Sequence, residues 1–321
     1  MMMNIVLTGG TGFVGQKLID YLLEHTNASL RLAVRQKPAR KFDQRVSLSL
    51  ITNISGTENW HDTLVDCKVV IHAAARVHMM DKSAHDSLAA YREINVNGTL
   101  NLARQAANQG VKRFIYLSSI KVNGESTPIG QPFHADDAAM PQCPYSISKY
   151  EAEQGLLALA KETGLEVVII RPVLIYGPGV KGNFKHMMKW LQKGIPLPLG
   201  LVKNKRSFVS VDNLADLITT CITHPRAANQ IFLVSDGEDL STTQLLKKMR
   251  AAFAKPVLLL PVPVWVLNST AKLLGKQIVI NRLCGSLQVD INKACELLGW
   301  KPTFTVDNVL LTTAKEYIRN N

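Results

Sequence analysis

Three side chains of this sequence could carry acid–base chemistry: Ser119, Tyr145 and Lys149. Tyr145 and Lys149 are four residues apart in a segment with a helical pattern, so both are expected on one helix face. A phenol with a pKa of about 10 is a poor base at neutral pH, and we expect the neighbouring ammonium to lower that pKa. Ser119 follows a strand pattern and could hydrogen-bond the same substrate oxygen. This set predicts proton exchange with a hydroxyl or carbonyl group.

A tyrosine and a lysine at this spacing also occur by chance on helix surfaces, so their meaning depends on the glycine-rich turn at residues 4–15. Gly9 can adopt the positive φ of a tight turn, Gly12 lets the backbone approach a pyrophosphate, and Gly15 lets the following helix pack close to the preceding strand. The amides of the helix N-terminus then face the phosphates, which predicts a dinucleotide-binding loop rather than a turn without ligand. The other candidate contacts in this loop are Thr11, Phe13 and Val14.

The first half of the chain alternates strand and helix patterns with short connections, which is typical of a parallel, doubly wound sheet. We therefore expect an α/β fold of the Rossmann type, with the catalytic tyrosine and lysine on a helix that follows the strand ending at Ser118 and Ser119. After the loop, further strands are predicted over residues 30–34, 46–51, 69–74, 114–117 and 167–170.

Beyond residue 175 the pattern becomes less regular, and we expect a smaller, mixed α/β substrate domain. The predicted division is 1–175 for the dinucleotide-binding domain and 176–321 for the substrate domain, the two being interleaved because parts of 207–236 return to the first. The most apolar stretch of this half, residues 258–274, could rest on a membrane surface, but we expect a helix packed in the core over 263–274.

The residue that ends the second predicted strand, about twenty positions after the glycine loop, is Arg35. A carboxylate at this place would accept hydrogen bonds from the ribose hydroxyls of NAD, whereas a guanidinium suits a 2′-phosphate. We therefore expect NADP in preference to NAD, the alternative being a solvated surface arginine. The small residues Ala73, Ala74 and Ala75 would let the dinucleotide cross the sheet edge, and His72 is expected to be structural.

The net charge of +12 is concentrated in residues 31–45 and 181–206. We expect these basic segments to serve phosphate groups of small ligands and not nucleic acid, because no recognition motif accompanies them. The five cysteines are far apart, without metal-ligand spacing, so no metal site is expected. The first strand pattern begins by Met3, and no stretch of eighteen uncharged apolar residues occurs. We expect a cytoplasmic protein without stable membrane insertion.

With these motifs in order, the chain resembles the extended short-chain dehydrogenase/reductase family, which contains NAD(P)-dependent nucleotide-sugar epimerases, dehydratases and reductases. The resemblance runs from Asn4 to about Trp300. Besides the glycine loop and the Tyr145 and Lys149 pair, it rests on His72-Ala73-Ala74-Ala75, Asn95-Val96-Asn97-Gly98-Thr99, Ser118-Ser119, Arg171-Pro172, Tyr176-Gly177-Pro178-Gly179, Arg206-Ser207-Phe208-Val209 with Asp212, and Arg282 ahead of Gly285.

The resemblance implies that Ser119, Tyr145 and Lys149 are catalytic and that Asn95 supports the lysine through water. It implies a UDP-sugar as substrate and a homodimer formed through the helix bearing Tyr145 and the long helix before the preceding strand. Ser118 and Pro172 join the expected cofactor contacts. The expected substrate contacts are Lys121, Asn183, Pro198, Leu199, Arg206 and Arg282, the two arginines holding the diphosphate.

Departures from the family pattern reduce the number of reactions that this chain is expected to catalyse. Dehydratases of the family place two acids directly after the position of Ser119, where this chain has Ile120 and Lys121, which cannot expel a hydroxyl. Together with Arg35, this favours a reductase of a UDP-4-keto-6-deoxy-N-acetylhexosamine in surface polysaccharide biosynthesis. One alternative is a UDP-glucose or UDP-N-acetylglucosamine 4-epimerase. The other is a dinucleotide-binding regulator without turnover, against which the complete Ser119, Tyr145 and Lys149 set argues.

Overall fold

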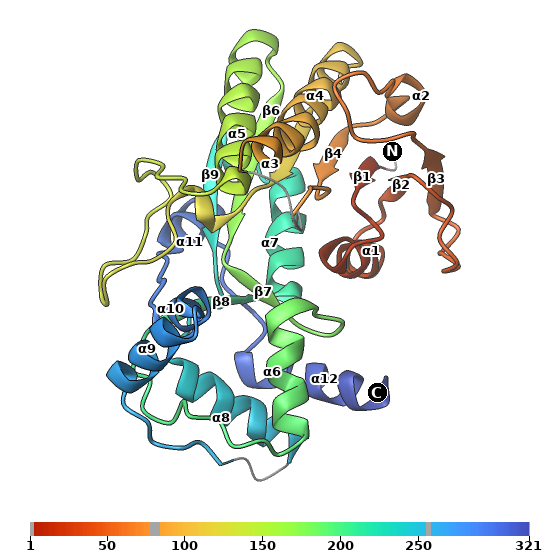
Figure 1. Ribbon diagram of the computed structural model, residues 1–321. Helices are drawn as coiled ribbons and strands as arrows, with labels where there is room; N and C mark the ends of the chain where they lie inside the picture. Colours follow the sequence, from red (N-terminus) through yellow and green to blue (C-terminus); the bar gives the residue numbers. More distant parts are fainter. Residues whose placement is uncertain (1–2, 78–83, 255–257, 321) are drawn as a thin grey trace.

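The computed structural model describes residues 3–77, 84–254 and 258–320. Its larger part is a seven-stranded sheet in the order β3-β2-β1-β4-β5-β6-β9, in which every neighbouring pair is parallel (Figure 1). The α/β doubly wound fold predicted from the sequence is confirmed. The strands are β1 (Asn4–Thr8), β2 (Ser29–Val34), β3 (Val46–Leu50), β4 (Val69–His72), β5 (Arg113–Leu117), β6 (Glu166–Pro172) and β9 (Gln230–Val234).

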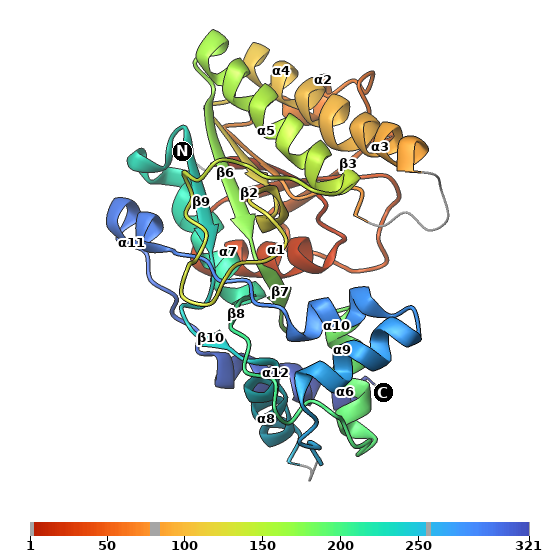
Figure 2. The ribbon, with the colours of Figure 1, turned by 60° about the vertical axis from the view of Figure 1, so that its left-hand side comes forward.

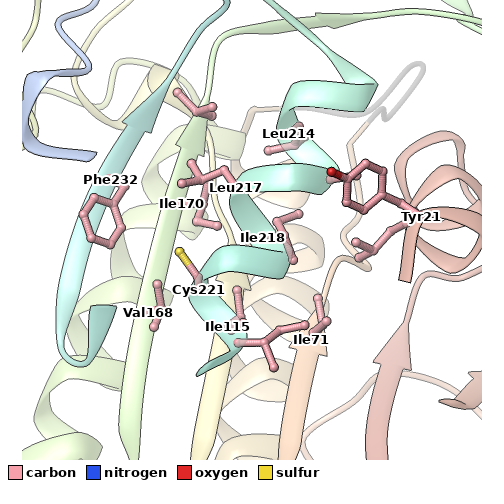
Figure 3. Packing of buried hydrophobic residues seen from close by; sticks show 14 of the residues in the cluster. Tyr21, Ile71, Ile115, Val168, Ile170, Leu214, Leu217, Ile218, Cys221 and Phe232 are labelled. Carbon is pink, nitrogen blue, oxygen red and sulfur yellow. The ribbon is translucent and has the colours of Figure 1, made fainter. Parts of the chain in front are cut away.

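Helices cover both faces of this sheet, so its central strands are apolar on both sides. On one face, α1 and α7 pack on alternate strand residues such as Ile115, Val168 and Ile170, as Figure 3 shows for α7. On the other face, α2, α4 and α5 pack on the residues between them, such as Val167 and Ile169. The helices of this part are α1 (Phe13–His25), α2 (His61–Leu64), α3 (Ala84–Arg92), α4 (Thr99–Asn108), α5 (Pro144–Thr163), α7 (Val211–Thr223) and α11 (Asn292–Leu298).

The smaller part is built on a three-stranded sheet in the order β10-β8-β7, with its own apolar core. It lies at the carboxyl end of the large sheet (Figures 1 and 2). The chain runs between the two parts several times, since β8 lies in the small sheet and β9 in the large one. Its elements are β7 (Leu174–Tyr176), α6 (Gly182–Gln192), β8 (Arg206–Ser210), β10 (Asp239–Leu240), α8 (Thr242–Phe253), α9 (Val264–Leu273), α10 (Gln277–Cys284) and α12 (Val306–Arg319).

The core helix expected over 263–274 is the clearest error of the sequence interpretation. Of the ten residues of α9, only Leu267 and Ala271 are buried, and Trp265 is 71% exposed. The apolar composition of this stretch therefore does not reflect burial, because the helix packs through one narrow face.

Part of the basic segment 31–45 has a structural use. Arg31 donates hydrogen bonds to the carbonyl oxygens of Asp62, Thr63 and Val65 at the end of α2. The guanidinium of Arg45 donates to the carbonyls of Leu23 and Thr26 at the end of α1. Carbonyls at a helix C-terminus lack partners and attract cations. These two arginines are thus occupied in capping helices and are not available to phosphate groups.

The glycine loop joins β1 to α1 at very close range. Gly9 has a φ of +75°, and Gly12 donates from its amide to the Gly9 carbonyl at 2.9 Å. A Cβ atom on Gly15 would lie 2.1 Å from the Gly9 carbonyl oxygen and 2.7 Å from the Gly10 Cα. Helix and loop can therefore approach this closely only because residue 15 has no side chain.

We predict that Gly15→Ala destabilises the protein by about 3 kcal/mol, because neither backbone nor helix can move away without breaking the α1 packing. The measurement is the free energy of unfolding in urea. Gly164→Ala is the matched control: Gly164 has a φ of +74°, and nothing lies within 4 Å of its added Cβ, so a cost of about 1 kcal/mol is expected. Equal losses in the two variants would contradict the packing argument.

Candidate active site

The predicted site residues gather where the parallel strands end. Ala73 follows β4, Ser118 follows β5 and Pro172 closes β6, and these strands are neighbours in the sheet. The strand order reverses between β1 and β4, with the glycine loop on one side and the alanines on the other. Ligands of doubly wound folds bind at such a switch point. An added Cβ on Gly9 would meet the Ala74 nitrogen at 2.7 Å, so the two segments touch.

Lys149 is buried on the face of α5 that packs on the sheet. Its ammonium donates a hydrogen bond to the Leu117 carbonyl at 2.7 Å and lies 4.0 Å from the centre of the Tyr116 ring. Burial lowers the pKa of Lys149 to about 7, although the carboxylate of Glu153 acts in the opposite direction. The lysine is therefore held at the end of β5 and can lose its proton near neutral pH.

Tyr145 lies on the first turn of the same helix, near enough to Ser119 for the serine hydroxyl to influence the phenol, so the structure brings these two predicted residues together. Burial raises the pKa of Tyr145 to about 12, and the Ser119 hydroxyl opposes this rise. The expectation that Lys149 makes the phenol more acidic is not met in the protein alone, because burial raises the pKa of Tyr145 and the Lys149 ammonium is directed at the Leu117 carbonyl.

Asn95 lies in a π-helical turn, Glu93–Gly98, that connects α3 to α4. Its side-chain amide donates to the Ser148 hydroxyl at 3.0 Å and to the Arg76 carbonyl at 3.1 Å, and its oxygen accepts from the Arg76 amide at 2.8 Å. Single turns of π-helix are frequent at functional sites. The hydrogen bonds of Asn95 thus connect the loop after β4, at Arg76, with α5, at Ser148. Ser148 directly precedes Lys149.

His72 is structural, as the sequence suggests. Its Nδ1 atom forms a hydrogen bond with the Thr8 hydroxyl at 2.7 Å, and its Nε2 atom forms one with the Thr99 hydroxyl at 3.0 Å. Burial, assisted by the charge of Lys149, lowers the pKa of His72 to about 3, so the ring is neutral at physiological pH. Among the described residues no group of three or more His, Cys, Asp or Glu side chains is arranged to hold a metal ion.

A buried ion pair beneath the site was not singled out from the sequence. The Arg171 guanidinium makes two hydrogen bonds from Nε to the Glu153 carboxylate, at 3.0 and 3.2 Å, and a third from Nη2 at 2.5 Å. The Ser118 hydroxyl donates to the same carboxylate, and Arg171 also donates to the Asn123 side-chain oxygen at 2.9 Å. The sequence does contain one signal for a buried charge here: Glu153 lies four residues after Lys149 and therefore on the same face of the helix.

Two of the predicted substrate residues meet in the smaller part. The Arg206 guanidinium donates to the carbonyls of Arg282 at 3.0 Å and Gly285 at 3.1 Å, and burial lowers its pKa. Arg282 itself is exposed at the end of α10. The Arg206 guanidinium thus lies against the backbone of residue 282, which brings the two predicted residues to one place in the smaller part.

The other predicted substrate residues are more dispersed. Leu199 is buried, and its carbonyl accepts a hydrogen bond from the Thr243 hydroxyl at 2.6 Å, whereas Pro198 is exposed. Lys121 forms an ion pair with Glu125 at 3.1 Å on the loop after β5. The side chain of Asn183 lies outside the described part of the structure.

The residues at the carboxyl edge fit a dinucleotide. Gly12 begins α1 without a side-chain cap, so the first amides of the helix are open to an anion. The positive φ of Gly9 and the missing side chain at residue 15 shape the cradle in which Thr11, Phe13 and Val14 also lie. Arg35 follows β2 at the same edge and is exposed to solvent.

The model of the NAD dependent epimerase/dehydratase family matches residues 5–235. A UDP-glucose 4-epimerase from Vibrio cholerae is 48% identical over 319 residues, which cover 99% of this chain and 96% of that protein. Among solved structures, UDP-glucuronic acid 4-epimerase from Bacillus cereus in complex with NAD superposes with a TM-score of 0.80 at 19% identity, covering 99% of both chains. UDP-glucose 4-epimerase from Thermotoga maritima with UDP-glucose gives 0.76 at 22% identity, again covering 99% of both.

The similarity to the Vibrio cholerae enzyme overturns the prediction of a reductase. A protein 48% identical over nearly the full length of both chains is an epimerase, which corresponds to the alternative. The preference for reduction depended on Arg35 and on the missing acid pair at residues 120 and 121, and neither an exposed cation after β2 nor the absence of those acids excludes an epimerase. The reductase prediction is therefore wrong.

We predict that Glu153→Ala lowers the free energy of unfolding by about 3–5 kcal/mol, because it leaves the buried Arg171 guanidinium without its counter-charge. Glu151→Ala is the control on the same helix, since the side chains of Glu151 and its partner Arg92 are 31% and 48% exposed and an exposed pair contributes up to about 1 kcal/mol. Urea denaturation measures both. A loss at residue 153 no larger than that at residue 151 would show that the buried pair is not needed for stability.

We also predict a pH dependence that originates from Lys149. Its pKa is about 7 in the folded protein and about 10.4 in the unfolded chain, so between these values the unfolded chain binds more protons and stability rises with pH. Lys149→Met removes this dependence. The free energy of unfolding of Lys149→Met minus that of the wild type should therefore be largest below pH 7 and should decrease towards pH 10. Urea denaturation at several pH values measures it, and a difference that does not change with pH would contradict the buried, titrating lysine.

Proposed function

The chain belongs to the NAD dependent epimerase/dehydratase family, the extended short-chain dehydrogenases/reductases, and on that premise we propose that it interconverts the C4 epimers of a UDP-hexose. UDP-glucose and UDP-N-acetylglucosamine are the substrates to test first. The observation that carries this proposal is the 48% identity, over nearly the whole of both chains, to a UDP-glucose 4-epimerase. The edge at which Ser119, Tyr145 and Lys149 lie supplies the groups that the reaction needs.

Epimerisation at C4 removes a proton from the hydroxyl and a hydride from the carbon, and returns both with the hydride on the other face. When bound, NAD supplies the hydride acceptor and donor. Tyr145 accepts the hydroxyl proton and later returns it, while Ser119 donates a hydrogen bond to the forming carbonyl oxygen. The raised pKa of Tyr145 means that its phenolate form needs a nearby positive charge. In the protein alone the Lys149 ammonium is bonded to the Leu117 carbonyl, and in the complex with substrate and cofactor Lys149 would supply that charge and hold the ribose hydroxyls.

Asn95 positions these groups in the proposal. It bridges the loop after β4 and Ser148, and so fixes the helix that carries Tyr145 and Lys149 relative to the sheet edge. Arg206 and Arg282 would hold the diphosphate of the UDP-sugar, with residues 198–199 beside its uridine end. Two guanidinium groups suit a diphosphate because each can pair with phosphate oxygens through several N–H groups.

NAD is the cofactor that we propose, with the glycine loop, Ala73–Ala75, Ser118 and Pro172 around it. The family is NAD dependent, and an enzyme that must return the same hydride benefits from a cofactor that stays bound. The one feature in favour of NADP is Arg35, which is exposed. Analysis of the nucleotide released from the purified, heat-denatured protein distinguishes the two.

We propose in addition a homodimer formed through α3, α4 and α5. These helices pack on one another within the chain, and α5 approaches α4 closely enough that a Cβ on Gly155 would meet the Leu100 side chain at 2.7 Å. Light scattering at micromolar concentration should give about twice the chain mass of 35.4 kDa. The division of the chain into two domains at residue 175 stays a prediction, and so does a role of the protein in surface polysaccharide biosynthesis.

We predict that the purified protein epimerises UDP-glucose or UDP-N-acetylglucosamine without added cofactor, and that Tyr145→Phe lowers kcat by about a hundredfold or more, because the proton then has no acceptor. Nuclear magnetic resonance of the sugar measures the interconversion. Tyr150→Phe, on the same helix, is the matched control and should keep kcat within about twofold.

Two results would contradict this proposal. One is the absence of interconversion with either substrate by protein that retains its dinucleotide. The other is activity in Tyr145→Phe equal to that of Tyr150→Phe.

A further inference from the structure

Helices α9 and α10 form a hairpin whose outer surface is apolar. Figures 1 and 2 show the two helices side by side at the outer edge of the smaller part. Of the 18 residues in these helices, only Leu267 and Ala271, both in α9, are buried. Large apolar side chains are instead exposed at the following fractions: Trp265 71%, Leu273 86%, Leu274 71%, Ile278 68% and Val279 49%.

The hairpin is anchored to the protein through its opposite face. Leu267 belongs to the apolar core of the smaller part, and Ile280 and Leu283 pack against that core. Trp265 and Leu273 are eight residues apart, two helical turns, and therefore lie along a face that does not reach the core. Gly275, with a φ of +64°, makes the turn between the helices and brings Leu274 and Ile278 to the tip. The exposed apolar side chains thus form one surface on a fixed support.

This surface is accompanied by positive charge and by no negative charge from its own segment. Residues 240–289 contain lysines and arginines but neither aspartate nor glutamate. Lys272 and Lys276 are exposed at the tip, beside Leu273 and Leu274. The segment 167–211, which includes α6, likewise has basic residues and no acidic ones. The chemistry of the surface therefore suits an occupant that is both apolar and anionic.

A second copy of the chain fits this surface poorly. A two-fold contact through the tip would place Lys272 and Lys276 of both copies together, and like charges facing one another oppose association. An anionic lipid surface has the required composition, since its headgroups attract lysines and its acyl region accepts Leu, Ile and Trp side chains. Tryptophan is enriched at this boundary in membrane proteins.

The dimensions require that such a helix lie on the membrane and not across it. The ten residues of α9 span about 15 Å, half of the roughly 30 Å of a bilayer core. Among the described residues no helix is long and apolar enough to cross a membrane.

We propose that the α9–α10 hairpin is a docking surface for an anionic lipid bilayer, with Trp265, Leu273, Leu274 and Ile278 entering the boundary between headgroups and acyl chains and Lys272 and Lys276 pairing with phosphate groups. The site proposed above for the nucleotide sugar does not include these residues, so the inference does not depend on the proposed function.

Cosedimentation with vesicles tests it. The full chain is mixed with vesicles of phosphatidylcholine alone or with about one third phosphatidylglycerol, at low and high salt. Wild-type protein should bind the mixed vesicles at least about tenfold more strongly than the neutral ones, and less strongly at high salt. The variant Trp265→Ser, Leu273→Ser, Leu274→Ser should lose binding by about tenfold or more. The variant Lys272→Gln, Lys276→Gln should lose about tenfold on mixed vesicles only.

Leu50→Ser is the matched control, because Leu50 is 71% exposed but lies on β3, in the larger part. It should bind vesicles as the wild type does. The midpoint of thermal unfolding should be the same for all variants, since every changed side chain is exposed. Absence of wild-type binding to mixed vesicles, equal binding by the triple variant, or equal loss in Leu50→Ser would overturn the proposal. So would light scattering in which the triple variant is monomeric and the wild type dimeric, without any difference in vesicle binding, because that result assigns the surface to a second copy.

Discussion

The ion pair between Arg171 and Glu153 joins the elements that carry the candidate site. Arg171 lies in β6, Glu153 in α5, and the Ser118 hydroxyl at the end of β5 donates to the same carboxylate. Burying both charges costs several kcal/mol per ion, and only a full set of partners offsets that cost. Here Asn123 supplies the last partner, from the loop after Ser119. The position of α5, and with it of Tyr145 and Lys149, is therefore determined by a network that tolerates little displacement.

Contacts of α1 connect this sheet edge with the smaller part. Phe13, at the start of the helix, packs against the apolar core of the smaller part, and the ammonium of Lys17 lies 2.5 Å from a carboxylate oxygen of Asp212. The helix whose N-terminus would face the phosphates of a dinucleotide thus also contacts α7, which directly follows β8, the strand that carries Arg206. The proposed cofactor and substrate residues are therefore connected through contacts of α1.

The fold and the centre of the site followed from local patterns, whereas the environment of each group did not. Glycine spacing and the succession of strands and helices predict which backbone segments meet, and the carboxyl edge with Gly15, Ser119, Tyr145 and Lys149 is where the sequence places it. Burial decides the rest. Spacing places Glu153 on the face of α5 that carries Lys149, but it predicts neither the pairing of Glu153 with Arg171 on β6 nor the raised pKa of Tyr145, because both depend on long-range packing. For the same reason the apolar composition of residues 263–274 predicts a core helix, which is wrong because most residues of α9 are not buried.

The position of β9 affects how the chain can be synthesised and divided. This strand, at residues 230–234, pairs with β6, yet β7, α6 and β8 are translated between them. Until residue 234 has left the ribosome, β6 is an open strand edge with apolar residues on both faces, which is a site of aggregation. A recombinant fragment that stops at residue 175 would keep that open edge permanently. The sheet of the larger part is therefore completed only after β7, α6 and β8 of the smaller one have been made.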